Sequence, residues 1–483
     1  MKLSVLAGET FSNDPEIAGL TADSRAVRRG FLFAALPGVI ADGAKFIPQA
    51  EENGAAAILA RPGVHSHLPI VIDPEPRRRL SHVAAKFFPR QPKMIAGITG
   101  TNGKTSTASF VAELWAMLGK SSGSLGTLGA KGKNYCRKLA HTTPDPVTLH
   151  SVLDEMAGAG ISHLAMEVSS HGLAQDRADG VQFSIAAFTN ITQDHLDYHR
   201  NAENYFRAKQ RLFQALLPDD GVVVVNADGD GVAAIIEIAK ARDLRILTTG
   251  AAGDDLKLVG ASAQPSGLDI NIMARGVSYN LRLPLIGGFQ AENALLAAGI
   301  VIASGEPVKK VLPLLEKLSG VPGRMQRVAE IIFDDGAAGV YVDYAHTPDA
   351  VETALLGVRP HAKGRVIAII GAGGDRDKTK RPLMGKAAAA HADAVIVTDD
   401  NPRTEDPAQI RQKILKGCPG ATEIGDRGQA IAAGVAQLGA GDVLLIAGKG
   451  HETGQQVGME VLPFSDEEAA IAAAQNRMKE LGR

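Results

Sequence analysis

Residues 97–106, Gly-Ile-Thr-Gly-Thr-Asn-Gly-Lys-Thr-Ser, have the composition of a loop that holds phosphate groups. Gly100 and Gly103 allow backbone N–H groups to face an anion, and a helix that begins after them adds positive partial charge. Lys104 is then placed to contact the outer phosphates of a nucleotide, and the Thr105 hydroxyl is placed to ligate Mg²⁺. The spacing departs from the usual G-x-x-x-x-G-K-[ST], whose first glycine would fall on Ile98. The alternative interpretation is a glycine-rich turn beside a surface lysine.

Two polar clusters follow later strands and suggest a metal site. Glu167 ends an apolar stretch over 161–168, and His195 and Asp197 come just after a second stretch, over 183–190. Both clusters should emerge at the sheet edge that carries the phosphate loop. A carboxylate and an imidazole beside a nucleotide suggest divalent cations, although Mg²⁺ prefers oxygen ligands and His195 is therefore the less expected member. The alternative is a local pair between His195 and Asp197 within their loop.

Lys209 has an unusual position in an amphipathic helix predicted over residues 204–217. On a 3.6-residue period it falls in the middle of the apolar stripe that contains Tyr205 and Leu212. A lysine there either extends its ammonium group to solvent or is functional. A functional role requires a lowered pKa, because burial disfavours the charged form. A neutral amine can act as a nucleophile, or it can take up CO₂ as a carbamate and become an anionic metal ligand.

Two shorter patterns have weaker chemical meaning. Residues 141–145, His-Thr-Thr-Pro-Asp, form a hydroxyl-rich turn that is able to hydrogen-bond a phosphate or a sugar. The start of a helix explains the same residues equally well. Arg177 is able to pair with a diphosphate, or with the nearby Asp176 or Asp179.

The expected elements around these residues alternate between strand and helix. A strand over 93–98 precedes the phosphate loop and a helix over 107–118 follows it, and further strands are expected over 161–168, 183–190 and 221–226. The segment 250–285 is richer in strand signals, and a helix resumes over 295–303. Such alternation predicts a parallel sheet with helices on both faces. Proline-containing segments at 89–92 and 321–323 divide the chain into three predicted α/β domains, 1–91, 92–322 and 323–483.

Polar, turn-forming clusters follow four strands that we expect in the third domain, over 339–342, 365–370, 394–398 and 442–446. Ligands of open α/β sheets bind beyond the carboxyl ends of the strands, so these clusters predict a binding rim. One of them is Asp400-Asn-Pro-Arg403. Its simple alternative is a plain turn, because Asn-Pro is a turn signal and Arg403 is able to pair with Glu405 or Asp406.

The composition excludes several classes of protein. The 483 residues are 45% hydrophobic and 22% charged, as in ordinary globular proteins, and 53 glycines with a single tryptophan favour an α/β enzyme over a β-sandwich. The net charge of −2 offers no basic face for nucleic acid. No apolar run approaches the ~18–20 residues of a membrane span, and the first residues lack a signal-peptide pattern. Cys136 and Cys418 form no C-x-x-C pair, so we expect plain thiols in a reducing cytoplasm.

Together the motifs resemble those of the Mur ligases, the ATP-dependent enzymes that add amino acids during peptidoglycan synthesis. The resemblance covers essentially the whole chain and accounts for the shifted glycines of the phosphate loop. It implies a small N-terminal UDP-binding α/β domain, a central ATPase domain with a phosphate loop and a parallel sheet, and a C-terminal Rossmann-like α/β domain. The matching segments are Asp23-Ser-Arg25, Gly100-Thr-Asn-Gly-Lys-Thr105, Glu167-Val-Ser-Ser-His171, residues 189–199, Gln290-Ala-Glu-Asn293, Gly323-Arg-Met325 and Asp343-Tyr-Ala-His346.

The resemblance also implies a role for each matched residue. Lys104, Lys209 and His195 would be catalytic. Mg²⁺ would be held by Thr105, Glu167, His195 and Lys209, the last as a carbamate. The UDP-muramoyl dipeptide would be bound by Ser24, Thr142, Thr143, Ser169, Gln175 and Arg177. ATP would be held by Gly100, Thr101, Asn102, Gly103, Lys104, Thr105, Ser106, Asn293, Arg324 and His346.

Within the family, the chain resembles the members that add the third residue to UDP-N-acetylmuramoyl-L-Ala-D-Glu. Residues 400–403 match the pattern of those that add meso-diaminopimelate. This amino acid differs from lysine by a second carboxylate, for which an arginine fork is the natural bidentate partner. Glu452 would pair with the distal ammonium. The implied diaminopimelate site comprises Arg376, Asp400, Asn401, Pro402, Arg403, Gly448 and Glu452.

These expectations describe an ATP- and Mg²⁺-dependent ligase that acts on small molecules as a cytoplasmic monomer, without nucleic-acid or membrane partners. A lysine-adding relative and a folylpolyglutamate synthetase are the alternatives within the class. Arg403 argues against the first, and the N-terminal domain with Asp23-Ser-Arg25 argues against the second. A nucleotide-driven binding or switch module is the alternative outside the class. Such a module has no need for Glu167, His195 and Lys209 together with a pocket for a second substrate.

Overall fold

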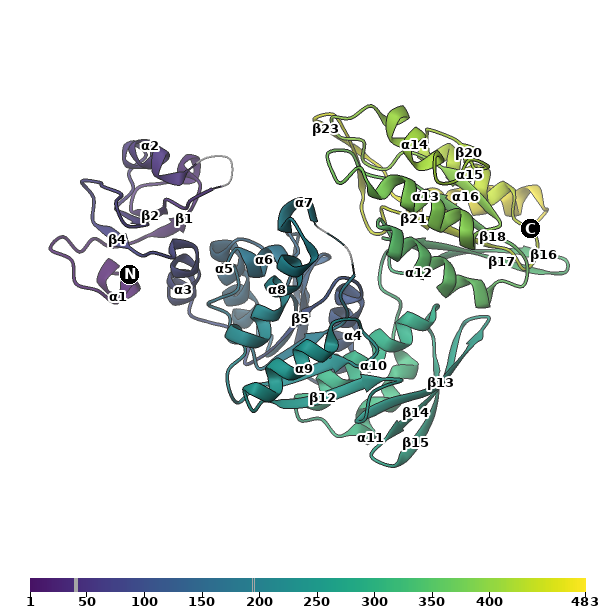
Figure 1. The fold of residues 1–483 in the computed structure, drawn as a ribbon, viewed down its shortest axis with the longest axis horizontal. Coiled ribbons are helices and arrows are strands. Elements are labelled where there is room, and N and C mark those ends of the chain that lie inside the picture. The colour runs from purple at the N-terminus through teal and green to yellow at the C-terminus, as the bar shows by residue number, and fades with distance from the viewer. Residues whose placement is uncertain (39–41, 193, 195) are drawn as a thin grey trace.

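The computed structural model describes residues 1–38, 42–192, 194 and 196–483, and three large sheets organise the chain. The sheets follow one another in sequence, and the central one lies between the other two (Figure 1). Helices cover them and enclose separate hydrophobic cores. The predicted α/β class is therefore confirmed. Each sheet lies within one of the predicted domains, whereas the boundaries after residues 91 and 322 stay predictions.

The N-terminal sheet has four parallel strands in chain order. Its inner strands are fully apolar, and all of their residues except the partly buried Phe31 are buried, which explains why they pair at the centre of the sheet. Helix α3 (Pro76–Phe87) packs on this sheet and also contacts α5 (Pro146–Gly158) of the next unit. The strands are β1 (Gly19–Thr21), β2 (Phe31–Ala34), β3 (Ala57–Ala60) and β4 (Ile70–Ile72).

The central sheet has eleven strands, and antiparallel strands at its two edges make it mixed. Its middle strands are parallel, as predicted: β6 (Ser122–Gly126), β9 (His163–Glu167), β5 (Met94–Thr99), β10 (Ile185–Phe188), β11 (Val222–Asn226) and β12 (Arg245–Gly250). The strand signals over 250–285 correspond to a three-stranded antiparallel ribbon, β13 (Leu256–Gln264), β14 (Gly267–Ala274) and β15 (Val277–Leu283). At the other edge, β7 (Gly129–Gly132) and β8 (Tyr135–Arg137) add an antiparallel hairpin.

Helices cover both faces of the central sheet. Helices α4 (Lys104–Met117) and α10 (Gly288–Ala303) bury one face, and both begin earlier than the predicted residues 107 and 295. The other face is covered by α5, by α9 (Val232–Ala241) and by the π-helical turn Leu212–Leu216. That turn follows α8 (Ala202–Arg211), so the helix predicted over 204–217 is present with a change of winding in its last part.

The C-terminal sheet has six strands, of which β16 (Gln326–Phe333) is antiparallel to its neighbour. The four predicted strands are present as β17 (Gly336–Asp343), β18 (Val366–Ile370), β19 (Ala394–Val397) and β21 (Val443–Ala447), with β20 (Thr422–Glu423) at the edge. One face is covered by α12 (Pro348–Val358), α13 (Lys380–His391) and α14 (Pro407–Leu415), and the other by α15 (Arg427–Ala436) and α16 (Asp466–Glu480). A separate hairpin joins β22 (Gly454–Val457) to β23 (Glu460–Pro463).

Two predictions about the whole chain can be compared directly with the fold. Both cysteines are free thiols, Cys136 exposed and Cys418 buried, as expected. Within the described part of the chain, no helix combines the length and the apolarity needed to cross a membrane.

His150 is a fully buried histidine on α5, beneath the helix α3 of the N-terminal unit. Within the described residues, neither of its ring nitrogens has a hydrogen-bond partner. Burial, and to a smaller extent the nearby His82, lowers the pKa of His150 from 6.5 to about 4. The imidazole is therefore packed as a neutral apolar group.

We expect the stability of the central domain to fall as the pH drops from 7 to 5, because the unfolded chain binds a proton at His150 before the folded chain does. In the folded chain the pKa of His150 is about 4, below the ordinary 6.5. The contribution of the neutral His150 to the free energy of unfolding is therefore fully present above pH 6.5 and is lost as the pH falls toward 4. The loss should be about 2 kcal/mol at pH 5, and His150→Leu should remove it. Urea unfolding followed by the fluorescence of the single tryptophan, Trp115, measures this loss.

The matched control is His67→Leu, because the side chain of His67 is 86% exposed. This variant should keep the pH dependence of the wild-type protein. If His150→Leu kept the pH dependence of the wild-type protein, the loss of stability would not arise from His150.

Candidate active site

The loop between β5 and α4 has the strand–loop–helix geometry predicted for a phosphate-binding loop. Gly100 and Gly103 adopt φ values of 147° and 83°, which L side chains rarely adopt. A Cβ atom at Gly100 would collide with the Thr189 hydroxyl, and one at Gly103 with the side-chain oxygen of Asn293. Both positions therefore require glycine, and the loop can bring its backbone close to a ligand.

Neighbouring segments hold the loop in place. The Thr101 hydroxyl lies 3.1 Å from the Tyr205 hydroxyl, and the Asn102 backbone N–H donates to Asn190 Oδ1 at 3.0 Å. The Thr189 hydroxyl donates to the Asn102 carbonyl at 2.6 Å. Ser106, further along, is buried in the first turn of α4. The loop is thus fixed in shape before any ligand binds.

Lys104 is not a surface lysine, so the interpretation as a turn beside such a lysine is wrong. Its side chain is partly buried, and Nζ donates to the carbonyls of Gly100 at 2.8 Å and Thr101 at 2.7 Å. Burial lowers the pKa of Lys104, and the nearby Glu167 carboxylate opposes this shift. A phosphate group would add negative charge beside this ammonium and stabilise it further.

Lys209 is buried, with 1% of its surface exposed, which rules out extension of its ammonium group to solvent. Its Nζ donates to the Gly100 carbonyl at 2.7 Å and lies 4.3 Å from the centre of the Tyr205 ring. Burial, with a smaller contribution from Lys104, lowers the pKa of Lys209 well below its ordinary value. The predicted place of Lys209 on the inner face of α8 is confirmed, and the amine has the low basicity that carbamate formation requires.

Glu167 is a buried carboxylate surrounded by hydroxyl groups. Its Oε2 accepts from the Thr105 hydroxyl at 2.9 Å, and its Oε1 accepts from the Thr127 backbone N–H at 2.8 Å. The Thr127 hydroxyl also donates to Oε2 at 3.2 Å. These oxygen donors suit Mg²⁺, so Thr105 and Glu167 fit the metal predicted at the end of the loop.

The predicted metal site also includes a histidine, His195. His195 lies outside the described residues. Among the residues that are described, no group of three or more His, Cys, Asp or Glu side chains is arranged to hold a metal. Of the predicted ligands, Thr105 and Glu167 lie close together, and their oxygen atoms suit Mg²⁺.

Side chains of the C-terminal domain reach the phosphate loop. Arg324 Nη2 donates to the Thr105 hydroxyl at 3.2 Å, and its guanidinium lies over the Tyr344 ring, 4.4 Å from the ring centre. Its Nε is buried without a partner in the described structure, as expected of a group that awaits an anion. Asn102 Nδ2 donates to Asp349 Oδ2 at 2.9 Å. The second and third domains thus meet at the loop.

Two further ATP-site predictions lie at the same junction. His346 is partly buried, and its Nδ1 lies 2.8 Å from the Tyr344 carbonyl. Burial lowers the pKa of His346, so the imidazole is neutral. Asn293 is buried in α10, where its Nδ2 donates to Gln290 at 3.1 Å and its oxygen lies over Gly103.

A cavity of about 840 Å³ lies between the central and C-terminal domains. From the central domain it is lined by Thr142, Ser169 and Arg177, all predicted substrate residues, and by Thr127, His171 and Asp194. From the C-terminal domain it is lined by His346 and by six of the seven predicted diaminopimelate residues: Arg376, Asp400, Asn401, Arg403, Gly448 and Glu452. Residues more than 200 positions apart in the sequence therefore face one space.

Arg403 does not form the local ion pair that the turn interpretation required. Its Nη1 donates to the Gly374 carbonyl at 2.7 Å, whereas Glu405 pairs with Arg381 and Lys378. Its backbone has a left-handed φ of 52°, and the hairpin β22–β23 holds it through the Gln456 carbonyl at 3.0 Å and the Gly458 N–H at 2.7 Å. The guanidinium lines the cavity without a carboxylate partner among the described residues.

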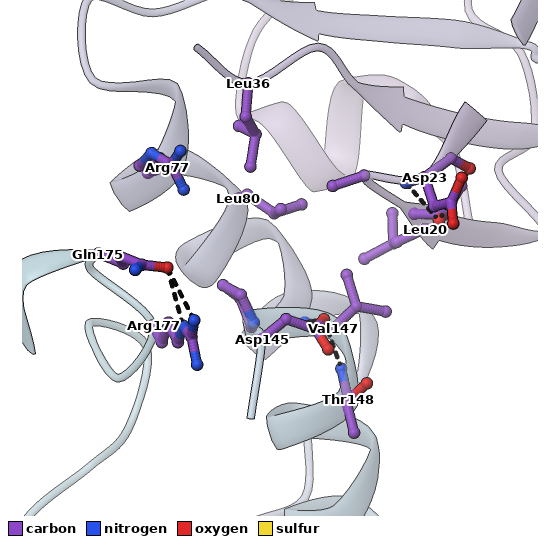
Figure 2. A pocket seen from close by; sticks show the side chains of 13 residues that line it. Leu20, Asp23, Leu36, Arg77, Leu80, Asp145, Val147, Thr148, Gln175 and Arg177 are labelled. Carbon is purple, nitrogen blue, oxygen red and sulfur yellow. Dashed lines mark hydrogen bonds between the residues drawn. The ribbon is translucent and has the colours of Figure 1, made fainter. Parts of the chain in front are cut away.

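A second cavity, of about 500 Å³, lies between the N-terminal and central domains and is drawn in Figure 2. Gln175 and Arg177 line it from the central domain, and Arg177 also lines the first cavity, so the two spaces share a wall. Arg177 donates to Gln175 Oε1 at 2.8 Å and to the Thr143 carbonyl at 2.7 Å, and not to Asp176 or Asp179. Arg77 of α3 lies above Gln175 and Arg177 in the view of Figure 2, with Asp23 across from all three.

Three of the predicted substrate residues line neither cavity. The Ser24 hydroxyl is buried against Gln49 at 2.7 Å, and the Thr143 hydroxyl donates to the Glu167 carbonyl at 3.1 Å. Pro402 is buried. The turn 141–145 also starts a helix, since Asp145 caps α5 by accepting from Val147 and Thr148 N–H groups. These residues therefore support the walls of the two cavities without lining them.

Several residues of the site were not predicted from the sequence. Thr127 binds Glu167 from a short turn between β6 and β7, where nothing but its glycine neighbour marks it. His451 lines the first cavity, and burial lowers its pKa to about 4. Tyr344, whose ring stacks on Arg324, lies within the motif 343–346, in which the sequence predicted a role for His346 alone.

Comparison with known proteins matches three segments of the chain to Mur ligase domains. Residues 16–87 match the family described as "Mur ligase family, catalytic domain", residues 98–301 the Mur ligase middle domain, and residues 323–450 the Mur ligase glutamate ligase domain. The chain is 48% identical to the UDP-N-acetylmuramoyl-L-alanyl-D-glutamate–2,6-diaminopimelate ligase of Bradyrhizobium diazoefficiens, over 99% of this chain and all of that protein.

The chain belongs to the Mur ligase family.

Solved structures agree with this assignment. A UDP-N-acetylmuramoyl-L-alanyl-D-glutamate–2,6-diaminopimelate ligase structure matches with a TM-score of 0.72 at 32% identity, covering 100% of this chain and 99% of the other. The MurF ligase of Thermotoga maritima in complex with ADP matches with a TM-score of 0.63 at 19% identity, over 96% of this chain and 98% of the other. The second likeness concerns the fold alone. The resemblance to the Mur ligases that the sequence motifs indicated is therefore confirmed.

We expect Gly103→Ala to weaken binding of an adenine nucleotide at least tenfold, because the new methyl group would displace Asn293 from the phosphate loop. The matched control is Gly119→Ala. Gly119 has nearly the same φ, 80°, but a Cβ there has nothing within 4 Å. Both variants carry the backbone strain, and Gly103→Ala alone should lose affinity in a nucleotide-binding titration. Equal affinities in the two variants would contradict the role of the loop.

Proposed function

We propose that this Mur ligase joins meso-2,6-diaminopimelate to the D-Glu γ-carboxylate of UDP-N-acetylmuramoyl-L-Ala-D-Glu and consumes ATP in doing so. The observation that carries the proposal is the cavity of about 840 Å³, in which Arg403 and Glu452 from one domain face Thr142, Ser169 and Arg177 from another. The relatives named for this reaction at 48% and 32% identity support it. The geometry of the loop at Gly100, Gly103 and Lys104 supports a nucleotide there.

The charges of the first cavity suit the distal end of diaminopimelate. That end carries a carboxylate and an ammonium group side by side. Arg403 offers a guanidinium fork for the carboxylate, and Glu452 offers a carboxylate for the ammonium. Lysine lacks the second carboxylate and would leave Arg403 without a partner, which disfavours it.

The second cavity suits the nucleotide end of the other substrate. Arg77 and Arg177 place positive charge on its walls, and the apolar side chains Leu20, Leu36 and Leu80 lie between them and Asp23 (Figure 2). A diphosphate would lie between the arginines. Because Arg177 lines both cavities, a UDP-muramoyl peptide that fills the second cavity would reach the first with its D-Glu end.

The reaction would proceed through an acyl phosphate. In the first step, the D-Glu γ-carboxylate attacks the γ-phosphate of ATP, and the bond to the β–γ bridging oxygen breaks, so that ADP leaves as the acyl phosphate forms. Lys104 and Arg324 neutralise the negative charge that gathers there. Mg²⁺, held by Thr105 and Glu167, would supply further charge neutralisation. In the second step, the diaminopimelate amine attacks the acyl carbon, and the tetrahedral intermediate releases phosphate as the amide forms. The two domains hold amine and acyl group together and limit the access of water.

Phosphate release from ATP tests the proposal directly. With UDP-N-acetylmuramoyl-L-Ala-D-Glu present, we expect turnover when meso-diaminopimelate is offered and little when L-lysine is offered. Arg403→Ala should lower kcat/KM for diaminopimelate about 100-fold or more, as expected when a bidentate charged hydrogen bond is lost. Preference for lysine would overturn the assigned amino acid, and turnover with neither would overturn the ligase reaction.

Lys209→Ala should abolish turnover while substrate binding is largely retained, because the carbamate proposed for this lysine is an anionic ligand of the metal. Added short carboxylates, such as acetate, should restore part of the activity by replacing that ligand. Steady-state phosphate release, with calorimetric titration of both substrates, separates turnover from binding. The exposed Lys240→Ala serves as the control. Full activity of Lys209→Ala would refute the carbamate.

A further inference from the structure

Lys449 is a lysine with no exposed surface, in the segment that follows β21. Its ammonium makes three hydrogen bonds: to Asn401 Oδ1 at 3.1 Å, to Glu452 Oε2 at 3.2 Å and to the Gly454 carbonyl at 2.6 Å. An ammonium has three protons to donate, so these acceptors satisfy it completely. Lys449 does not line the cavity and cannot contact a substrate there. Both side chains that it binds do line the cavity.

The contacts of Lys449 fix the orientation of the Asn401 amide. Asn401 Oδ1 faces two groups that can only donate, the Lys449 ammonium at 3.1 Å and the Gln456 backbone N–H at 2.9 Å. The amide oxygen must therefore point at Lys449, and Nδ2 must point the other way. Nδ2 donates to Glu452 Oε2 at 2.8 Å.

Glu452 is held by one of its two oxygens. Oε2 accepts from both Lys449 and Asn401, whereas no hydrogen bond to Oε1 is present within the described residues. The side chain is 32% exposed and lines the cavity. A carboxylate tethered in this way presents its second oxygen in a fixed direction, at no further cost in side-chain entropy.

We propose that Lys449 is a positioning residue for recognition of the distal ammonium of the amino-acid substrate. It acts through Glu452 and Asn401: it holds Glu452 Oε2 so that Oε1 is aimed at the ammonium, and it fixes the Asn401 amide that shares this oxygen. The inference rests on the proposed function, because it assigns Glu452 to the distal ammonium of diaminopimelate. Lys449 thereby contributes to specificity without touching the substrate.

Recognition of the distal carboxylate depends on different contacts. Arg403 is held by its side-chain bond to the Gly374 carbonyl and by backbone bonds to Gln456 and Gly458. None of these bonds includes the Lys449 ammonium. The two distal groups of the substrate should therefore respond differently when Lys449 is changed, and this difference separates positioning from general damage to the domain.

The experiment compares Lys449→Met with the wild-type enzyme on three amino acids: meso-diaminopimelate, L-2-aminopimelate, which lacks the distal amine, and L-lysine, which lacks the distal carboxylate. Methionine keeps the unbranched shape and most of the length of the side chain and removes the charge. We expect KM for diaminopimelate to rise about 10- to 100-fold, the range for a lost charged hydrogen bond, with KM for ATP and for the UDP-muramoyl dipeptide unchanged. The preference for diaminopimelate over 2-aminopimelate should fall to that of Glu452→Gln. The preference over lysine should change little.

A fall of both preferences together, or of neither, would overturn the inference. Lys416→Met, at an exposed lysine of the same domain, should match the wild-type enzyme. Because Lys449→Met leaves Glu452 without its cation, the double variant Lys449→Met/Glu452→Gln is measured as well. It should have the amino-acid preference of Glu452→Gln alone, since Lys449 acts through Glu452, and independent effects of the two substitutions would refute this. An absence of turnover with diaminopimelate in the wild-type enzyme would instead overturn the proposed function, on which the role of Lys449 rests.

Discussion

The arrangement of the active site depends on two lysines, one fully buried and one partly buried, that share one acceptor. Lys104 and Lys209 both donate to the Gly100 carbonyl, and burial lowers the pKa of each. Two ammonium groups at hydrogen-bonding distance from one oxygen repel each other by several kcal/mol even at an effective dielectric constant of about 20. Either a phosphate beside Lys104 or conversion of Lys209 to a carbamate relieves this repulsion. The site is therefore built for the negative charge that the proposed reaction brings to it.

The same loop couples the central and C-terminal domains. Arg324 crosses from one to the other to reach Thr105, which in turn donates to Glu167, and Thr127 binds the same carboxylate from the wall of the amino-acid cavity. The nucleotide end and the amino-acid end of the reaction are thus joined by a short series of hydrogen bonds rather than by a long path. Movement of the C-terminal domain would alter both ends together, as expected of a ligase that must bring an amine to an acyl phosphate.

Lys209 and Lys449 illustrate how much the sequence alone could predict. Lys209 was identified because a helix has a defined period, and a lysine on the apolar stripe stands out against it. Lys449 is equally buried but lies in an irregular segment, where no period relates a residue to the core. The strands and the phosphate loop were predicted for the same reason as Lys209, since they have regular patterns. The antiparallel hairpin β7–β8 and the role of Thr127 were not predicted, because short polar turns acquire their contacts only through distant segments.

The proposed selectivity for diaminopimelate follows from what a wrong substrate would leave unpaired. Arg403 is held at a left-handed φ of 52° by the hairpin β22–β23, and Glu452 is held by the buried Lys449, so neither side chain can turn away at low cost. Lysine would satisfy Glu452 and leave the guanidinium of Arg403 facing the cavity alone. A site with fixed charged groups rejects an analogue that lacks one partner much more strongly than an apolar pocket rejects a missing methylene. Rigid placement of the two charges, more than their presence, would therefore set the choice of amino acid.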